Sequence, residues 1–561
     1  MAHAQRLPAA LALCTAIAAL GLLGAPAGAI ASTGQEAMFQ DDTAVLANPV
    51  GTLQRMRLLG VGTVRVFLRW QNIAPAARSR RRPRGFRAGD PAAYPARNWA
   101  PYDAIVQAAH ADGIKVLFDA VGGAPLWATG PGAPRGKLFL NWEPSGGEFS
   151  SFVRAAGTRY SGSYDPRSRS SDPGNANDLP RVSFWSIWNE PDYGPSLAPQ
   201  GVPGHLLVEN SPRLYRALLD GGWSGLRASG HGGDRILFGE VAPRGFPNSE
   251  EPKYTFGVFS GMKPLVFLRA LYCVDRSYRQ LRGSAAAIRG CPTTAAGSRG
   301  FRAAHPGLFR ASGFADHPYM RWYPPNREAH PDPDYSTLGL IGQLSRSLDR
   351  VQGAYGSGAR LPIYDTEFGY ITSPPKHPTR ALPWASQSDA AYFLNWAEYL
   401  SWRNPRLRSF EQYLLFDPLP NLASNDHGGF ASGLLSYGSG RPKQTYDAWR
   451  LPLYLPVTST TRGRSLEVWG SARAAHFALN DQGGGPQSVE IRFRPRSGAP
   501  SFTLQTVPIT DPGGYFDVRV KFPSSGTVSL KWTYPPQDQL LVPAPAPGFA
   551  IYSRSVGVTI R

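Results

Sequence analysis

One pattern repeats from Glu36 to about Pro452 and limits the folds open to this chain. A short apolar or β-branched run is followed by a loop and then by a stretch with apolar residues three to four positions apart, eight times in all. Strands that alternate with helices form parallel sheets covered on both faces, and eight such units predict a closed (β/α)8 TIM barrel. The expected strands lie at 36–42, 63–70, 114–121, 181–191, 235–243, 312–320, 361–370 and 409–418.

The other fold built from such units is an open doubly wound sheet. That sheet often carries a glycine-rich phosphate turn after its first strand, but QDDTAVLANP follows here. The barrel domain, expected over 33–452, exceeds the ~250 residues typical of the fold, so its loops are enlarged. The largest insertions are 73–98, 129–147, 161–180 and 243–310, and all of them follow strands.

The character of the chain changes after Pro456. Short alternating strands separated by Gly, Pro and Ser clusters predict a small C-terminal β-sandwich over 457–561. It carries no evident catalytic residues. A carbohydrate-binding role and a bracing role against the barrel both stay open.

The first 31 residues read as an export signal. A basic start at Arg6 precedes an apolar run to Leu23, and small residues favour cleavage near Ala29 or Ala31. A retained membrane anchor is the alternative, although no later segment reaches the ~20 apolar residues that span a bilayer. We therefore expect a secreted, extracellular or cell-envelope protein with no stable membrane insertion once the signal is removed.

Two cysteines, Cys273 and Cys291, remain after removal of the signal. An even pair in an exported protein favours a disulfide, with two buried thiols as the alternative. Their spacing does not suggest a metal site, because no CxxC or HxxxH accompanies them. No metal or other cofactor is expected.

The net charge is +19, and the densest basic segment is RSRRRPRGFR at 78–87. Basic clusters attract polyanions, so an anionic glycan or envelope polymer is one partner to consider. A solvated surface loop is the plainer interpretation of Arg78–Arg87. We recognise no nucleic-acid-binding motif around it and expect no nucleic acid partner.

Two glutamates stand at strand ends where a barrel supplies catalytic groups. Glu190 ends the fourth expected strand in FWSIWNEP, and Glu367 ends the seventh in IYDTEFGY. Retaining cleavage of a glycosidic bond needs an acid for the departing oxygen and a carboxylate that attacks the anomeric carbon, ~5–5.5 Å apart. Only barrel closure could bring these two residues together.

The residues around this pair resemble clan A glycoside hydrolases, particularly families 5 and 39. WNEP at 188–191, HPY at 317–319 and TEFG at 366–369 carry the resemblance, which covers the whole barrel. It implies Glu190 as acid/base and Glu367 as nucleophile, Asn189 as donor to the sugar 2-hydroxyl, and substrate-site roles for His317, Tyr319 and Arg65. Tyr319 would hydrogen-bond the nucleophile and Arg65 would keep it ionised.

Aromatic platforms for the apolar faces of sugars are expected in the cleft. Trp70, Trp127 and Trp322 follow strands and suit that role, with core packing as the alternative for each. The chain departs from the resemblance at strand eight, where Phe416 and Asp417 stand in place of a tryptophan. Further carboxylates that could reach sugar hydroxyls, or be structural, are Glu240, Asp41, Asp119 and Asp417.

The sequence thus predicts a secreted, monomeric, retaining glycosidase that acts on a poly- or oligosaccharide. Two alternatives stay open. A transglycosylase would use the same residues, and a non-catalytic glycan- or envelope-binding barrel would keep the fold without the chemistry.

Overall fold

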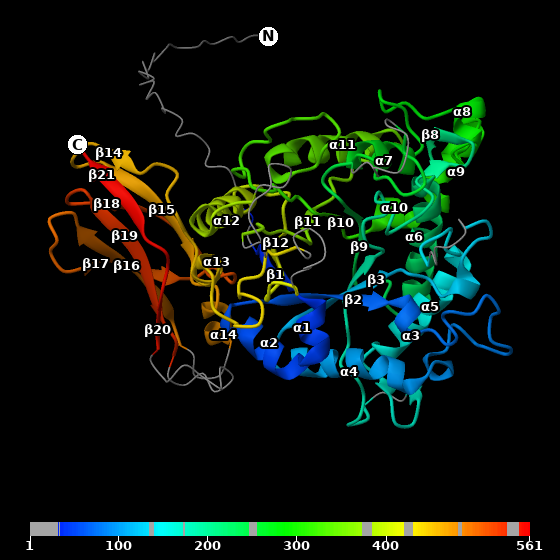
Figure 1. The fold of residues 1–561 in the computed structure, drawn as a ribbon, viewed down its shortest axis with the longest axis horizontal. Helices are drawn as coiled ribbons and strands as arrows, with labels where there is room; N and C mark the ends of the chain where they lie inside the picture. The colour runs from blue at the N-terminus through cyan, green and yellow to red at the C-terminus, as the bar shows by residue number, and fades with distance from the viewer. Residues whose placement is uncertain are drawn as a thin grey trace, which may run out of the picture.

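The computed structural model describes residues 32, 34–133, 140–171, 174–245, 255–372, 384–419, 430–480, 485–535 and 549–561. Figure 1 shows a barrel with surrounding helices, followed along the chain by a separate β domain. The predicted export signal at 1–31 lies outside the described residues. No helix among these residues is long and apolar enough to cross a membrane.

Eight parallel strands form the barrel, as the sequence predicted. They are β1 (Glu36–Gln40), β2 (Thr63–Arg69), β3 (Lys115–Val121), β6 (Phe184–Ile187), β9 (Arg235–Val241), β10 (Gly313–Asp316), β11 (Ile363–Asp365) and β12 (Ser409–Tyr413). Neighbouring strands pair in chain order, and β12 returns to pair with β1. The barrel closes between β11 and β12, where Ile363 exchanges backbone hydrogen bonds with Arg406 and Arg408.

Several strands end earlier than predicted. The fourth was expected over 181–191 but spans Phe184–Ile187, and the eighth was expected to reach residue 418 but ends at Tyr413. The backbone turns left-handed soon after each end, at Trp188 (φ 65°) and at Leu414 (φ 81°). This conformation is incompatible with an extended strand, so turns form the carboxyl-terminal end of the barrel at these two strands.

Helices cover the outside of the barrel (Figure 1). Side-chain caps begin several of them: Asp41, Asn48, Ser145 and Ser386 each accept a backbone N–H of the first turn. The helices of the barrel domain are α1 (Asp42–Ala47), α2 (Pro49–Leu58), α3 (Trp70–Ile73), α4 (Ala96–Ala111), α5 (Gly146–Arg159), α6 (Ser211–Ala228), α7 (Pro264–Leu271), α8 (Gly283–Ala287), α9 (Ala295–Ala304), α10 (Pro306–Arg310), α11 (Ile341–Gly353), α12 (Gln387–Trp402) and α13 (Gln444–Arg450).

The barrel interior is layered. Six buried apolar side chains from six strands form a cluster of their own: Met38, Leu117, Phe184, Leu237, Ala315 and Tyr364. Because side chains alternate along a strand, residues two positions further on face the same interior. Those residues include Gln40, Asp119, Ser186 and Thr366, so the next layer is polar and fully buried.

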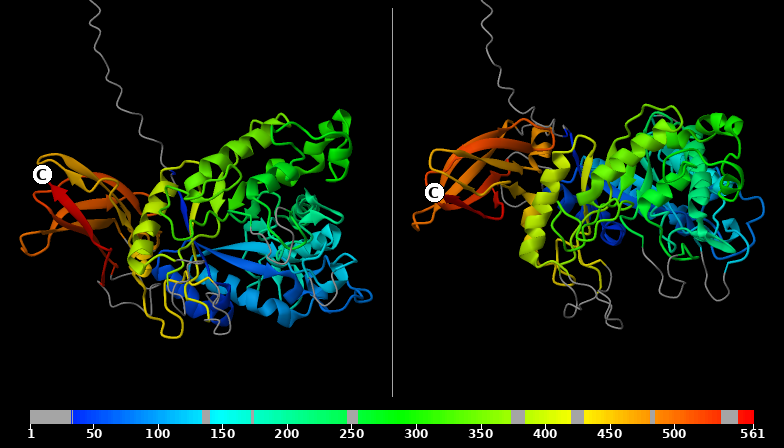
Figure 2. Two further views of the ribbon diagram at one scale, coloured as in Figure 1. Left: turned by 45° about the horizontal axis from the view of Figure 1, so that its top comes forward. Right: turned by 90° about the horizontal axis from the view of Figure 1, so that it is seen from above.

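A disulfide crosslinks the insertion that follows β9. Cys273 and Cys291 form a disulfide with a Cα–Cα distance of 5.7 Å, which confirms the predicted pairing. The hairpin of β7 (Gly201–Val202) and β8 (His205–Glu209) lies beside this insertion, and a second small hairpin joins β4 (Tyr164–Asp165) to β5 (Ser170–Ser171). In Figure 2 these elements lie on the side of the barrel away from the C-terminal domain.

The C-terminal domain packs two sheets around its own apolar core, as predicted. One sheet holds β13 (Leu453–Tyr454), β15 (Ser465–Ser471) and β18 (Tyr515–Lys521). The other holds β14 (Ser459–Thr460), β16 (Gln487–Pro495), β17 (Phe502–Ile509), β19 (Gly526–Thr533), β20 (Ala550–Tyr552) and β21 (Val556–Ile560), with α14 (Ala475–Asn480) between the sheets in sequence.

Buried polar contacts join the two domains. Arg473 is 1% exposed, donates to a Glu398 carboxylate oxygen at 2.7 Å and to the Trp449 carbonyl at 3.1 Å, and stacks over the Trp449 ring. Tyr515 donates to the other Glu398 oxygen at 2.8 Å. This buried ion pair favours one orientation of the two domains, because separating them would leave the Arg473 charge buried without a partner.

Candidate active site

The two glutamates singled out from the sequence meet at one end of the barrel. Glu190 follows β6 and Glu367 follows β11. One carboxylate oxygen of each, together with a ring nitrogen of His317, lies within 4.8 Å of the others. Glu367 is 6% exposed and Glu190 lies half-buried. Both therefore face a shared space that solvent can enter.

A strained turn presents Glu190. Trp188 and Glu190 both have left-handed backbones (φ 65° and 43°), and the Glu190 N–H donates to the Glu240 carbonyl at 2.8 Å. The Trp188 ring lies against Gly122, where an added Cβ would come within 2.6 Å of it. Non-glycine residues adopt this conformation rarely, and such strain is concentrated at functional sites.

Donors surround the Glu367 carboxylate. The Arg65 guanidinium donates to Oε1 at 2.7 Å and the Tyr319 hydroxyl donates to Oε2 at 3.2 Å. Each carboxylate oxygen of Glu367 therefore has its own donor, which fixes the orientation of the group. Arg65 and Tyr319 are the partners that the resemblance implied for Glu367.

Arg65 is the centre of the polar layer. Its fully buried guanidinium reaches Asp119 at 2.7 Å, Glu240 at 2.9 Å and the Asn189 side-chain oxygen at 2.8 Å, and it also donates to Gln40. Burial acts to lower the pKa of Arg65, but Glu240 and Asp119 raise it well above its ordinary value. One arginine thus positions both the Asn189 amide and the Glu367 carboxylate.

His317 links the two glutamates to a third. Its Nδ1 lies 3.1 Å from Glu190 Oε1 and 3.7 Å from Glu367 Oε2, and its Nε2 lies 2.9 Å from Glu240 Oε2. Burial acts to lower the pKa of His317, yet Glu367 and Glu190 raise it well above its usual range. A protonated ring that donates from both nitrogens fits these contacts.

Glu240 is structural in this arrangement. It is fully buried and accepts from Arg65, from His317, from Ser186 Oγ at 2.5 Å and from Thr366 Oγ1 at 2.6 Å. Burial acts to raise its pKa, but Arg65 and His317 hold it below the usual range. Its arginine partner is Arg65 on β2, which agrees with the structural alternative for Glu240.

A cavity of about 520 Å³ opens above the glutamates. Aromatic side chains form most of its wall, which suits the apolar faces of sugar rings. Its aromatic and cationic lining residues are Tyr193, Tyr319, Trp322, Trp384, Tyr413, Phe430, Arg244 and Arg321. Of the three tryptophans proposed from the sequence as sugar platforms, Trp322 alone lines it.

Trp70 and Trp127 follow the alternative that the sequence left open for them, which is packing in the core. Trp70 is fully buried and begins α3, so its ring stacks on Phe152 at 5.7 Å in the core. Trp127 packs edge-on against Trp70, and its ring N–H donates to the Pro75 carbonyl at 3.0 Å. Neither residue lines the cavity between the glutamates. Both indole rings complete a helix–loop interface.

The remaining strand-end acids are also structural. Asp41 caps α1 and accepts from Leu415 and Phe416 N–H groups, Asp119 pairs with Arg65, and Asp417 pairs with Lys443 at 2.8 Å. Strand eight contributes Tyr413 to the cavity, and neither Phe416 nor Asp417 lines it. The departure noted at Phe416–Asp417 therefore concerns residues outside the cavity.

One buried acid in the polar layer escaped sequence reasoning. Glu411 on β12 is fully buried, and neither of its oxygens has a hydrogen-bond partner among the described residues. Burial raises the pKa of Glu411 well above its ordinary value, with Arg65 acting in the opposite direction. A protonated, neutral side chain suits that position. The sequence signal for Glu411 was its position in the strand SFEQY, because every second side chain of a barrel strand faces the interior.

Comparison with known proteins gives neighbours of low similarity. No family model matches the chain, and no curated protein matches it. A family 39 glycoside hydrolase from Bacteroides cellulosilyticus WH2 is 14% identical, with 87% of this chain and 79% of that chain covered and a TM-score of 0.42. An exo-beta-1,4-mannosidase from Opitutaceae bacterium strain TAV5 is 15% identical, with 76% and 61% covered and a TM-score of 0.40.

A family 1 β-glucosidase from Thermotoga maritima is 14% identical, with 72% of this chain and 85% of that chain covered and a TM-score of 0.41. The assignment of the barrel fold rests on the strand order and closure of this chain itself. The assignment of the site rests on the distances among Arg65, Glu190, His317 and Glu367.

The three groups Glu190, His317 and Glu367 have the spacing of a metal site. Their hydrogen bonds argue against that use. Arg65 and Tyr319 already donate to the two oxygens of Glu367, and a protonated His317 offers no lone pair to a cation. The arrangement instead suits proton transfer between one carboxyl group and a substrate oxygen.

Proposed function

We propose that this protein is a secreted retaining glycoside hydrolase that cleaves an extracellular poly- or oligosaccharide. The observation that supports it most is the short separation between one carboxylate oxygen of Glu190 and one of Glu367, which lie within 4.8 Å of each other. Retaining enzymes keep their carboxyl groups ~5–5.5 Å apart, whereas inverting enzymes leave ~6.5–9.5 Å for a water molecule. Hydrolysis with retention is the outcome this spacing favours.

In the first step Glu190 gives its proton to the glycosidic oxygen while a Glu367 oxygen attacks the anomeric carbon. The bond from that carbon to the leaving oxygen breaks as the bond to Glu367 forms, so a glycosyl ester and a free alcohol result. The hydrogen bonds from Arg65 and Tyr319 orient the Glu367 carboxylate, and they weaken as its negative charge falls during attack. Asn189, fixed by Arg65, presents its side-chain N–H₂ toward the sugar.

In the second step Glu190, now a carboxylate, takes a proton from a water molecule. The water oxygen attacks the anomeric carbon and the ester bond to Glu367 breaks, which restores both glutamates. His317 donates to Glu190 and lies near Glu367 throughout. Its positive charge stabilises whichever of the two carboxyl groups is ionised at each stage.

The test is release of reducing ends by the purified protein from a panel of neutral and acidic polysaccharides. Glu367→Ala should lower turnover by roughly 10⁴-fold. Azide or formate should restore part of it, because a small anion can enter the space left by the side chain. Glu490→Ala is the control, since Glu490 lies on β16 of the C-terminal domain.

Equal turnover of every polysaccharide in the panel by wild type and Glu367→Ala would contradict the hydrolase assignment. Binding of glycans by both proteins without turnover would favour the non-catalytic alternative. Transfer of the released sugar to an added sugar alcohol in place of water would favour a transglycosylase. That acceptor competition separates the two enzyme classes without changing a residue.

Secretion is a proposal that rests on the first 31 residues. Expression of the full chain in a host with a general export pathway should release protein whose first residue lies between Gly28 and Ser32. N-terminal sequencing of the exported protein tests this. Retention of Met1 in a membrane fraction would favour the anchor.

A further inference from the structure

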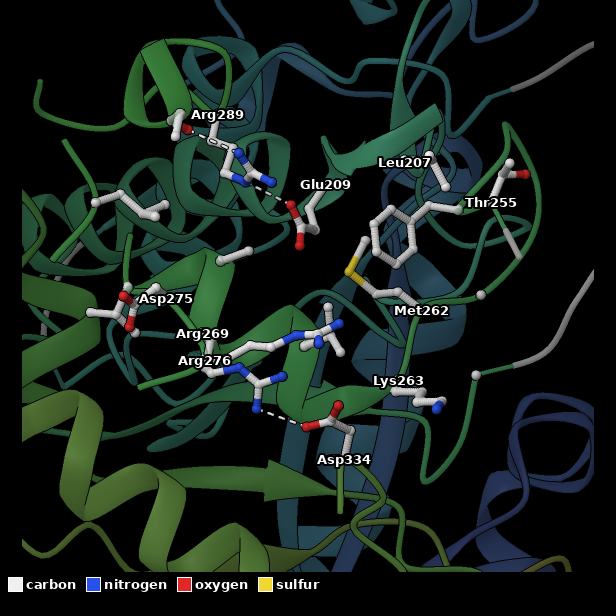
Figure 3. Close-up of a pocket in the computed structure, with 18 residues that line it drawn as sticks. Leu207, Glu209, Thr255, Met262, Lys263, Arg269, Asp275, Arg276, Arg289 and Asp334 are labelled. Carbon is white, nitrogen blue, oxygen red and sulfur yellow. Dashed lines mark hydrogen bonds and ion pairs between the residues drawn. The ribbon is translucent and has the colours of Figure 1, made fainter. Parts of the chain in front are cut away.

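A second and larger concave surface lies beside the catalytic cavity. Two hollows of about 980 and 480 Å³ share Lys263, Arg269, Arg276 and Asp334 and therefore join into one depression, here called the basic trough. Figure 3 shows its larger part, with Arg269 and Arg276 at the left, Leu207 at the upper right and Lys263 at the lower right. Its walls come from β8, α7, the disulfide-closed loop and one face of α11.

Positive charge exceeds negative charge in the trough. Six cationic and four acidic side chains line it: Lys263, Arg269, Arg276, Arg289, Arg346 and Arg350, against Glu209, Asp275, Asp332 and Asp334. Every one of the acids is already paired, Asp275 with Arg279 outside the trough and the others with Lys263, Arg269 and Arg289.

Three arginines are left over. Arg276, Arg346 and Arg350 are exposed, and none of them has a carboxylate partner within the described ranges. The Arg350 guanidinium lies 3.9 Å from the centre of the Tyr278 ring, which holds it at the trough wall. A ligand that brings its own negative charges would meet these arginines without displacing an existing ion pair.

The trough is built rigidly. Arg216 is 3% exposed and donates to the carbonyls of Ala270, Leu271, Arg289 and Gly290, which ties α7 to the far end of the disulfide loop. The Cys273–Cys291 disulfide joins the same two segments. A binding surface that is already ordered loses little entropy when a ligand binds.

One wall of the trough is apolar. Leu207 on β8 is 68% exposed, and Phe256, Met262, Val266 and Leu281 continue that wall. An exposed leucine over a charged groove suits a ligand with both apolar faces and anionic groups, as a chain of acidic sugars has. Nucleic acids bind such grooves by stacking bases on several aromatic rings, and this wall offers one phenylalanine.

The trough continues from the acid/base side of the catalytic cavity. Arg244 lines the cavity and Lys263 lines the trough, and both cations lie 5.8 Å from the centre of the same Tyr335 ring. The Met262 N–H donates to the Asp192 carbonyl at 2.8 Å, and Gly261 pairs with Tyr193. The trough therefore begins within a few residues of Glu190.

We propose that the basic trough binds an anionic glycan strand, through its carboxylate or sulfate groups, on the leaving-group side of the scissile bond. The position on the leaving-group side rests on the proposed function, because Glu190 is the group that protonates the departing oxygen. The chemical class of the ligand rests on the three uncompensated arginines and the apolar wall. The substrate is then an acidic polysaccharide cut between a sugar held over Glu367 and a segment held in the trough.

The test measures binding without turnover, in protein that carries Glu367→Ala. The probes are an oligogalacturonate, a heparin oligosaccharide, a neutral malto-oligosaccharide and single-stranded DNA of matched length, at two salt concentrations. The trough variant is Arg276→Gln/Arg346→Gln/Arg350→Gln. The matched control is Arg462→Gln/Arg464→Gln/Arg496→Gln, which removes the same charge from exposed positions of the C-terminal domain.

The trough variant should bind its acidic glycan about tenfold or more weakly, while the control binds as the parent does. Affinity should fall as salt rises and be weak for the neutral probe. The galacturonate and heparin arms tell carboxylate from sulfate recognition. Equal affinity in the trough variant and the parent would overturn the proposal, as would tighter binding of DNA than of either acidic glycan.

The same trough substitutions, made in the protein that keeps Glu367, test this proposal separately from the proposed function. On an acidic polysaccharide the trough substitutions should raise KM about tenfold and leave kcat on a short aryl glycoside unchanged. Loss of acidic-glycan binding in a protein that hydrolyses nothing would keep the trough as a glycan site and refute its place beside a scissile bond. An unchanged KM on the acidic polymer would refute the trough while hydrolysis stands.

Discussion

The charged groups at the two ends of the barrel interior differ in their exposure to solvent and in the sign of the excess charge. At the amino-terminal end Glu36 meets Arg235 at 2.5 Å and Lys115 at 3.4 Å, and these three side chains reach solvent, while the buried Thr63 hydroxyl donates to Glu36 at 2.9 Å. At the carboxyl-terminal end Arg65 meets Asp119, Glu240 and Glu367 with no solvent contact of its own. One end has a cation excess in water, and the other a buried acid excess.

The difference teaches what each end is for. Exposed ion pairs in water contribute little to stability and nothing to chemistry, so the amino-terminal end closes the barrel and tolerates change. Buried acids are costly unless each has a donor or a proton, and the carboxyl-terminal end supplies both through Arg65, His317 and protonated neighbours such as Asp316. Burying these acids lowers the stability of the fold, and the same contacts hold Glu367 and Asn189 in place.

The largest effect should follow from Arg65→Met. Removing the cation leaves Asp119, Glu240 and Glu367 buried without their partner, and we expect about 3–5 kcal/mol lower free energy of unfolding together with loss of activity. Chemical denaturation followed by tryptophan fluorescence measures it. A variant that unfolds at the wild-type denaturant concentration would mean that the polar layer does not depend on Arg65.

A smaller and purely functional effect should follow from Tyr319→Phe. The substitution removes the hydroxyl that donates to Glu367 but keeps the ring that packs against Phe430 and Phe368. Catalytic efficiency kcat/KM should fall roughly 10- to 100-fold, with a melting temperature close to that of wild type. An equal loss in stability and activity would show that the tyrosine acts only through packing.

The two ends should also respond to pH with opposite sign. Burial raises the pKa of Asp316 to about 8, so its contribution to stability is complete below the unfolded pKa and is lost as pH rises toward 8. Burial acts to raise the pKa of Glu36 as well, but Lys115 and Arg235 lower it, so its contribution exists above the unfolded pKa and is lost on acidification.

Asp316→Asn should therefore stabilise the protein by at least about 1 kcal/mol at pH 8 and have little effect near pH 4. Glu36→Gln should destabilise it at pH 7 and lose that effect at low pH. Melting temperatures of both variants across this pH range make the measurement. The same sign for both variants would contradict the contrast between the two ends.

The smallest effect should come from Arg235→Met at the amino-terminal end. The Arg235 side chain is 36% exposed, and Lys115 remains beside Glu36. We expect a loss of at most about 1 kcal/mol and unchanged kcat. A loss as large as that from Arg65→Met would mean that exposure does not distinguish the two ends.

Sequence reasoning reached the barrel because parallel strands are buried on both faces and read as apolar runs. It also placed Glu190, His317, Tyr319 and Glu367 at one rim, since residues at the carboxyl ends of barrel strands converge. Strand lengths were less accessible. The left-handed turns at Trp188 and Leu414 carry no glycine that would have marked them.

Residues from loops were the least predictable. Arg244, Trp384 and Phe430 line the cavity but lie on segments whose path no periodicity describes. Trp70 shows the reverse error, because a tryptophan after a strand can face a cleft or start a helix, and here it starts α3. Glu411 could have been read from the alternation in SFEQY, yet an acid inside a barrel contradicts the usual burial preference.

The stereochemistry of the first product tests the central claim most directly. Proton NMR of the sugar released from the fastest substrate of the panel reports its anomeric configuration before the anomers equilibrate. One oxygen of Glu190 lies within 4.8 Å of one oxygen of Glu367, and this spacing predicts a first product with the configuration of the substrate. A first product of inverted configuration would contradict the account, because it would require a water molecule where the structure places Glu367.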